Sequence, residues 1–285
     1  MYRQGGHEVL TETVHIAVPT AFLDDESLYV EGTVNHIRNL SKQGVKSVLV
    51  SGTTGEQHSL SLIEKLELID GIEKEAELIQ NMEIIFGVSS VRQKDAEELA
   101  EKISTTNFSG IMIGYPPYIK PSQQEAIVYT ERLLQLSNKP AILYNNPGRT
   151  GFDLAEESII YLSQYAEIVG VKDAGSVEKV ARIKDAIHRN DFYFYAGGEV
   201  ELVEKVAGGY NRLSSIAGNV LPKEISQWFN KLVEQQEITG RESEQIHSIL
   251  EEVYRGNAIV NVKKMISEQG FPIGGCRSPI GNSLF

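Results

Sequence analysis

Short apolar runs alternate along the chain with segments in which apolar residues recur at helical spacing. Eight of these runs, rich in β-branched residues, follow one another at intervals of roughly 30 residues. They lie at residues 14–22, 45–53, 82–90, 110–116, 141–147, 167–173, 192–198 and 212–219. A buried strand followed by a helix is the repeating unit of a parallel sheet, and eight such units close a barrel. The pattern therefore predicts an α/β fold, namely a (β/α)8 TIM barrel.

The segments between the runs predict helices that surround the barrel. In one of them, Leu62, Leu66 and Ile69 would share the face that packs on the strands. The strand pattern stops after the eighth run, and three amphipathic segments follow at 220–236, 240–256 and 257–270. No Pro/Ser-rich linker divides the chain. We expect a barrel domain over 1–221 and a C-terminal three-helix extension over 222–285.

Composition narrows the classes of partner. The chain of 285 residues has a formal net charge of −12 and no cluster of Lys and Arg, which argues against nucleic acid or an anionic membrane as a partner. Its single cysteine, Cys276, excludes an intramolecular disulfide, and the lack of Cys/His clusters argues against a metal site. The first residues, MYRQGGHEVLTETV, hold no apolar run of signal-peptide length, and no run of about 18 apolar residues occurs. We expect a cytoplasmic protein.

Polar residues follow several of the predicted strands. In a (β/α)8 barrel the active site lies at the carboxyl ends of the strands, so these residues are candidates for the site. They are Thr53, Thr54, Glu56, Tyr118, Tyr144, Arg149, Lys172, Gly197, Ser214 and Ser215.

Lys172 is the most informative candidate because it lies at the end of an apolar run, residues 168–173, that predicts a buried strand. A buried ammonium without a guaranteed ion pair is costly, so the residue needs a reason. Desolvation would lower the pKa of the amine, and the neutral amine can attack a carbonyl to form a Schiff base that acts as an electron sink. The alternative is a strand-end lysine whose ammonium reaches water.

Two motifs favour the chemical interpretation. GTTGE at 52–56 places two hydroxyls between glycines that let a ligand approach the backbone, although alone it is compatible with a plain turn. YNNPGRTG at 144–151 combines a phenol, which can carry a proton, with a guanidinium, which can hold a carboxylate through two hydrogen bonds. Taken singly, Tyr144 could be a buried aromatic and Arg149 a surface charge. Their conjunction favours a site.

Together with Lys172, these motifs resemble those of the dihydrodipicolinate synthase/N-acetylneuraminate lyase family of pyruvate-dependent class I aldolases. The resemblance covers essentially the whole chain and rests on GTTGE at 52–56, the YxxP core of 144–151 and VKDA at 171–174. It implies a Schiff base between lysine and pyruvate, and attack of the resulting enamine on an aldehyde. No metal or organic cofactor is required. It also implies a homodimer or homotetramer.

The resemblance implies roles for individual residues. Lys172 would form the iminium, and Tyr144 would donate and accept protons at the strand end. Thr53 would link this phenol to a second one, Tyr118, which in this family reaches the site of a neighbouring subunit across a tight dimer interface. The substrate-binding residues would be Thr54, Arg149, Gly197 and Ser214.

Arg149 narrows the choice of aldehyde. The lysine-biosynthetic members of this family have an arginine here for the carboxylate of L-aspartate 4-semialdehyde, whereas sialic acid lyases usually lack it. Residues 146–148 and 87–90 depart from the pattern of those members. We expect condensation of pyruvate with L-aspartate 4-semialdehyde. The alternatives are a 2-keto-3-deoxy sugar acid aldolase, an N-acetylneuraminate lyase, or a catalytically silent member that binds a keto acid.

Overall fold

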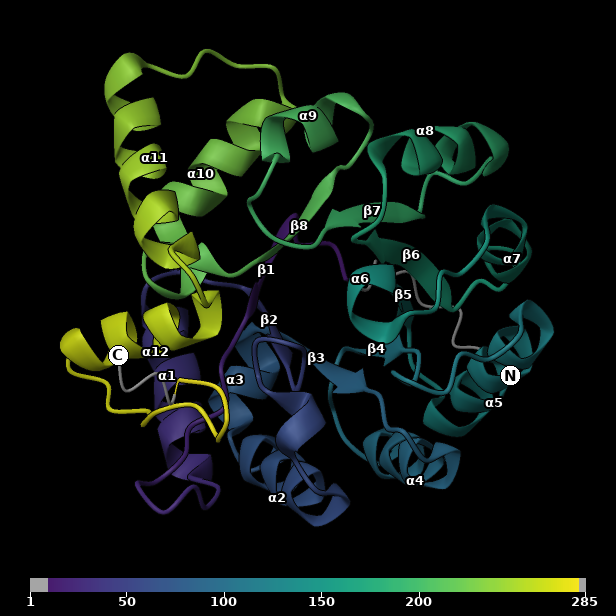
Figure 1. The fold of residues 1–285 in the computed structure, drawn as a ribbon, viewed down its shortest axis with the longest axis horizontal. Helices are drawn as coiled ribbons and strands as arrows, with labels where there is room; N and C mark the ends of the chain where they lie inside the picture. The colour runs from purple at the N-terminus through teal and green to yellow at the C-terminus, as the bar shows by residue number, and fades with distance from the viewer. Residues whose placement is uncertain (1–9, 282–285) are drawn as a thin grey trace.

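The eight predicted strands form a closed barrel. The computed structural model describes residues 10–281. Most of the first 14 residues, where we expect no signal peptide, therefore lie outside the described residues. Within 10–281, eight parallel strands pair in chain order, and β1 pairs with β8 to close the ring (Figure 1). They are β1 (Val14–Ala17), β2 (Ser47–Val50), β3 (Glu83–Val88), β4 (Gly110–Gly114), β5 (Ala141–Asn145), β6 (Ile168–Asp173), β7 (Tyr193–Ala196) and β8 (Arg212–Ser215). The predicted (β/α)8 barrel is confirmed.

Helices surround the strands and continue beyond the last one (Figure 1). Those between β1 and β8 are α1 (Val30–Lys42), η1 (Gln57–Ser59), α2 (Leu62–Glu73), α3 (Ala76–Asn81), α4 (Gln93–Ser104), α5 (Gln123–Ser137), α6 (Pro147–Thr150), α7 (Glu156–Leu162), α8 (Val177–Ala186) and α9 (Leu202–Ala207). Those after β8 are η2 (Ala217–Asn219), α10 (Pro222–Val233), α11 (Gly240–Tyr254) and α12 (Ala258–Glu268).

Both faces of the strands are covered, which is why the strands read as continuous apolar runs rather than as alternating ones. The outer face packs on the helices and forms the main core. The inner face holds a smaller apolar cluster inside the barrel. Its buried members are Leu10, Ala17, Leu49, Ile85, Met112, Ile142 and Tyr195.

Capping residues fix where several helices begin. Ser61 accepts a hydrogen bond from the backbone N–H of Glu64, whose carboxylate in turn accepts one from the N–H of Ser61, at the start of α2. The same reciprocal pair of bonds begins α5 at Ser122 and α11 at Thr239. Each pair satisfies two N–H groups that a helix terminus would otherwise leave without partners.

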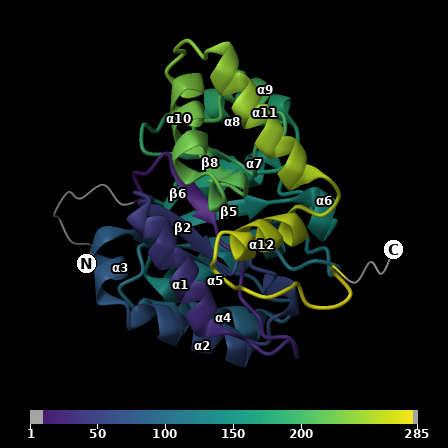
Figure 2. The same cartoon turned by 90° about the vertical axis from the view of Figure 1, so that its left-hand side faces the viewer.

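Of the three C-terminal helices, α10 packs on the barrel and α11 packs on the other two helices. Helix α10 contacts β1 and α9, and Thr13, the residue before β1, donates a hydrogen bond to Oδ1 of Asn230 in α10 over 2.8 Å. Helix α11 lies beside α10 in both views and packs on α12 (Figures 1 and 2). Among residues 10–281, no helix combines the length and the apolar character needed to cross a membrane.

Candidate active site

Lys172 occupies the carboxyl half of β6 and points into the barrel. Its side chain is only 6% exposed, and its Nζ donates a hydrogen bond to Oγ of Ser214 on β8 over 2.9 Å. The same nitrogen lies 4.7 Å from the centre of the Tyr144 ring on β5. No carboxylate forms an ion pair with it among the residues that the structure describes. The predicted burial of this lysine at a strand end is confirmed.

The surroundings of Lys172 favour a neutral amine. Burial lowers its pKa, the charges of Tyr144 and Glu199 oppose that shift, and Arg149 adds to it. The net result is a pKa below the ordinary value for lysine. A neutral amine with its lone pair available is the form that attacks a carbonyl.

Tyr144 stands beside Lys172 with its hydroxyl in a chain of hydrogen bonds. Its OH lies 3.2 Å from Oγ1 of Thr53, and Nδ2 of Asn146 donates to it over 2.8 Å. Burial raises the pKa of this phenol, but the charge of Lys172, the two hydrogen bonds and Arg149 outweigh burial and lower it. A lowered pKa makes it easier for this phenol to give up its proton and take it back.

A cavity of about 240 Å³ opens next to Tyr144 at the carboxyl ends of the strands. Thr53, Tyr144 and Arg149 line it. Its other lining residues are Ser51, Gly52, Gln57, His58, Gly87, Ser89, Met112, Gly114, Tyr115, Pro117, Asn146, Thr150 and Ile280. The volume suits a small metabolite rather than a large ligand.

Three further candidates lie near this cavity without lining it. Thr54 is buried beside Thr53, and Ser214 is buried against Lys172. Gly197 follows β7, and a Cβ built on it would lie 3.3 Å from Cε of Lys172. A glycine at 197 therefore leaves the space that the lysine side chain uses.

Arg149 lies in the short helix α6, exposed and on the wall of the cavity. It forms no ion pair with the residues described, so its guanidinium is available to a ligand. The turn that carries it begins with Pro147 and ends at Gly151, which adopts a left-handed conformation with φ of 70°.

Tyr118 is not brought into the site by its own chain. Its side chain is 91% exposed, and its backbone has a φ of 76°, which a tyrosine rarely adopts. A hydrogen bond from its N–H to the carbonyl of Thr150 helps to hold this conformation. The role in a neighbouring subunit therefore stays a prediction.

Glu56 faces away from the cavity. Its carboxylate is fully buried and accepts hydrogen bonds from Nζ of Lys263 over 2.8 Å and from the N–H of Arg277 over 2.9 Å. It thereby fastens α12 and the segment that follows to the end of β2. That segment includes Ile280, which reaches the cavity wall.

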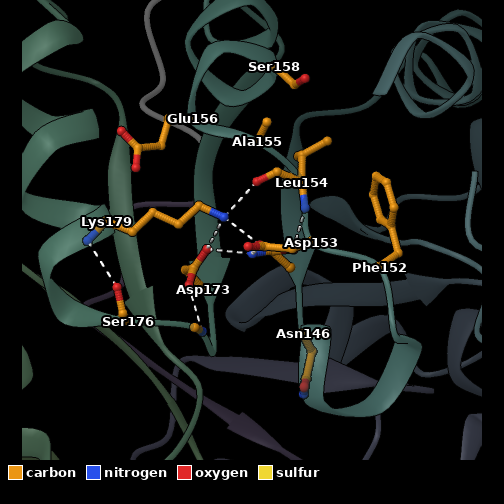
Figure 3. Close-up of polar contacts among 12 residues, drawn as sticks. Asn146, Phe152, Asp153, Leu154, Ala155, Glu156, Ser158, Asp173, Ser176 and Lys179 are labelled. Atoms are coloured by element: carbon orange, nitrogen blue, oxygen red, sulfur yellow. Dashed lines mark hydrogen bonds and ion pairs between the residues drawn. The ribbon is translucent and has the colours of Figure 1, made fainter. Parts of the chain in front are cut away.

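A polar cluster outside the barrel holds the loop that carries Arg149. Nζ of Lys179 donates to Oδ1 of Asp153 over 2.5 Å and to the carbonyl of Leu154 over 2.6 Å. Nδ2 of Asn145 bridges Asp153 and Asp173 over 2.7 and 2.8 Å. Figure 3 shows Lys179, Asp153 and Asp173 converging at the back of this loop. Because Asp173 follows Lys172 directly, one strand supplies both the amine and this anchor.

Sequence reasoning missed two groups near Lys172. In sequence Asn146 stands out only as a departure from the family pattern, whereas its Nδ2 donates to the Tyr144 hydroxyl. Glu199 is buried and accepts hydrogen bonds from the hydroxyls of Ser215 and Tyr254, each over 2.5 Å. Burial raises the pKa of Glu199 despite these donors. Glu199, directly after the Gly-Gly pair that ends the seventh run, was the available signal, since a carboxylate at a strand end is a candidate site residue.

One protein family matches nearly the whole chain. The profile of the Dihydrodipicolinate synthetase family covers residues 11–283. The 4-hydroxy-tetrahydrodipicolinate synthase of Ligilactobacillus salivarius is 30% identical over 267 residues, which cover 93% of this chain and 91% of that protein.

Solved structures share the fold. The dihydrodipicolinate synthase of Acinetobacter baumannii in complex with pyruvate superposes with a TM-score of 0.82 at 25% identity, covering 94% of this chain and 91% of that one. A variant of the 2-keto-3-deoxygluconate aldolase of Sulfolobus solfataricus has a TM-score of 0.78 at 23% identity, covering 94% of this chain and 90% of that one. This last likeness concerns the fold alone.

Proposed function

The chain belongs to the dihydrodipicolinate synthetase family, and we propose that it joins pyruvate to L-aspartate 4-semialdehyde through a Schiff base on Lys172, as a 4-hydroxy-tetrahydrodipicolinate synthase. It is an enzyme of the class I lyase type, and its place would be in lysine biosynthesis. The cytoplasm is the compartment we propose.

The observation that carries this proposal is the environment of the Lys172 nitrogen. The amine is buried, bonded to a hydroxyl rather than to a carboxylate, and adjacent to a phenol. Two of the other buried lysines, Lys179 and Lys263, pair with carboxylates, whereas a nucleophilic lysine needs to lose its proton. The complex of the A. baumannii relative with pyruvate supports the choice of the first substrate.

Tyr144 and Thr53 supply the proton transfers. Pyruvate condenses with the amine and releases water, loss of a methyl proton gives an enamine, and the enamine carbon attacks the aldehyde. Each step moves a proton near the nitrogen, where the Tyr144 hydroxyl lies within 3.2 Å of Thr53. Thr54 and the backbone at Thr53 would receive the pyruvate carboxylate.

Arg149 would select the aldehyde. It stands on the cavity wall without a protein carboxylate, so it can bind the carboxylate of an acidic aldehyde through two hydrogen bonds. Such a contact contributes roughly 1.5–3 kcal/mol, which is enough to favour an acidic partner over a neutral one.

A second subunit would complete the site with Tyr118. This residue follows β4, and its exposed neighbour Ile119 and the exposed Val91 after β3 lie at the same rim of the barrel. Exposed apolar side chains at one rim suit a dimer interface. We propose a homodimer, or a homotetramer built from two of them.

The experiment is a turnover assay with pyruvate and a panel of aldehydes, comprising L-aspartate 4-semialdehyde, N-acetylmannosamine and glyceraldehyde. We expect the acidic aldehyde to be used best. Arg149→Ala should weaken transition-state binding of this aldehyde by about 2–4 kcal/mol, which lowers kcat/KM for it. Formation of the pyruvate adduct on Lys172 should be unchanged. Arg241→Ala, which removes an exposed arginine in α11 far along the chain from the site, is the matched control.

The other outcomes identify the alternatives. Preference for a neutral sugar aldehyde, unaffected by Arg149→Ala, would indicate a sugar acid aldolase or a sialic acid lyase. Binding of pyruvate without turnover of any aldehyde, and without an adduct on Lys172, would indicate a silent keto-acid-binding member.

A further inference from the structure

Ser214 approaches the reacting nitrogen from the side opposite Tyr144. Lys172 lies on β6 and Ser214 on β8, and the hydrogen bond between them is 2.9 Å long. Strand β7 lies between these two strands, and Gly197 is the first residue after β7. Ala196 of β7 pairs with Leu213 of β8, so the next residues, Gly197 and Ser214, lie side by side. The lysine side chain reaches this hydroxyl through the space that the glycine leaves, since a Cβ on Gly197 would lie 3.3 Å from Cε of Lys172.

Ser214 is completely buried, and its hydroxyl accepts a hydrogen bond from the amine. Four titratable or charged groups face Lys172 from the elements around it. They are Tyr144 on β5, Arg149 in α6, Glu199 after β7 and His15 on β1. The carboxylate of Glu199 is already engaged by the hydroxyls of Ser215 and Tyr254. None of these groups forms an ion pair with Lys172 among the residues in 10–281.

The chemistry of imine formation leaves one proton on this nitrogen. The neutral amine bonds to the keto carbon of pyruvate, the C–O bond breaks, and the oxygen leaves as water. That water carries one amine proton and one proton from the acid catalyst, and the remaining N–H belongs to a cationic iminium. Only this protonated form withdraws electrons strongly enough for the methyl proton to be lost.

We propose that Ser214 is a positioning residue that accepts the remaining N–H and so keeps the Schiff base on Lys172 protonated. This inference rests on the proposed function. A hydroxyl suits the task because it accepts a hydrogen bond from the amine before reaction and from the iminium after it. A carboxylate at the same place would hold the lysine as an ammonium, which cannot attack pyruvate.

The hydrogen bond to a cationic N–H is stronger than the one to a neutral amine. Removing the hydroxyl therefore costs the iminium more than it costs the free enzyme. The iminium of a variant without it should lose its proton at a lower pH, while affinity for pyruvate changes less. A purely structural role for Ser214 would change stability without moving that pH.

The test is trapping of the pyruvate adduct with cyanoborohydride, which reduces protonated imines selectively, from about pH 6 to about pH 10. Intact-mass spectrometry gives the fraction of protein that carries the reduced adduct. We expect the alkaline midpoint of Ser214→Ala to fall by about one to two pH units, the shift for loss of one hydrogen bond to a charged group. Ser214→Thr, which keeps the hydroxyl, should retain the midpoint of the unmodified protein.

Two results separate the inference from its premise. If the unmodified protein traps no adduct, the proposed Schiff base fails. If it traps adduct and Ser214→Ala has the same alkaline midpoint, the role of Ser214 is overturned. Ser214→Cys, similar in volume with a weak acceptor, serves if the alanine variant does not fold, and its midpoint should also fall; an unchanged midpoint in a folded cysteine variant contradicts the inference.

Discussion

Lys172 and Lys179 are both buried and stand on the two sides of the same strand end. Lys179 lies outside the barrel, bonded to the carboxylate of Asp153 and 3.8 Å from that of Asp173. Lys172 lies inside, bonded to a serine hydroxyl and placed over a tyrosine ring. One lysine has carboxylate partners that balance a positive charge, and among the residues described the other has only uncharged partners within hydrogen-bond distance.

Lys263 belongs with Lys179 in this comparison. It is 1% exposed and donates to the buried carboxylate of Glu56 and to the carbonyl of Gly275. Depth alone therefore does not distinguish a reactive lysine from a structural one. The kind of partner separates Lys172 from Lys179 and Lys263.

Within 10–281, Lys65 is also buried without a carboxylate partner, because its Nζ donates to Oε1 of Gln57 and to the carbonyl of Ser89. Lys172 differs from Lys65 in lying beside the phenol of Tyr144.

The largest expected effect follows removal of the amine inside the barrel. Lys172→Met should reduce turnover about 10³-fold or more because no other nucleophile replaces it. Its free energy of unfolding should be unchanged or raised, since the variant buries an apolar chain in place of a desolvated amine. Turnover assays and urea denaturation measure the two quantities. Turnover close to that of the unmodified protein would refute the Schiff-base mechanism.

The opposite pattern is expected for the lysine outside the barrel. Lys179→Met leaves Asp173 buried without its cation and should lower the free energy of unfolding by about 3 kcal/mol. Folded protein should still form the pyruvate adduct on Lys172. Lys264→Met removes an exposed pair with Glu268 and is the matched control, with an expected cost under about 1 kcal/mol. Equal stability losses in the two variants would break the comparison.

A third prediction asks whether the inner site, unlike the outer cluster, needs a second chain. Tyr118→Phe and Lys172→Ala subunits should each be inactive alone. Mixed and reassembled in equal amounts, half of the dimers are hybrids and one of their two sites is complete. About a quarter of full activity should then return. Mixtures as inactive as their parents would exclude a role for Tyr118 in trans.

The smallest expected effect concerns pH. Burial lowers the pKa of Lys172 in the folded protein, so between that pKa and the ordinary lysine value the unfolded chain binds more protons. Stability of the unmodified protein relative to Lys172→Met should therefore rise as pH rises through this window. Below this window the unmodified protein should be less stable than Lys172→Met by a constant free energy of unfolding. Denaturation curves at a series of pH values measure the difference in free energy of unfolding between the two proteins. If the unmodified protein became less stable relative to Lys172→Met as pH rises, the prediction would have the wrong sign.

Much of this arrangement was predictable from local patterns. The eight apolar runs have the length of strands and recur with helices between them, so the barrel followed from periodicity. Lys172 and Tyr144 end their runs, and the carboxyl ends of parallel strands meet at one rim. Their proximity was therefore a consequence of the fold.

The partners of these residues were not predictable in the same way. Ser214 is 42 residues from Lys172 in sequence, and Tyr254 is 55 residues from Glu199. Such contacts depend on how side chains pack across the barrel and on where α11 docks. Asn146 is two residues from Tyr144, yet its bond to the phenol depends on the turn at Pro147. Sequence patterns locate the strand ends, but they do not predict which side chains contact one another there.

The most direct test of the central claim compares all buried lysines in one digest. The protein is incubated with pyruvate and borohydride, cleaved, and its peptides are mapped by mass spectrometry. We predict a reduced adduct on Lys172 and none on Lys65, Lys179 or Lys263, which are equally shielded from solvent. An adduct on one of those lysines with Lys172 unmodified would contradict the account.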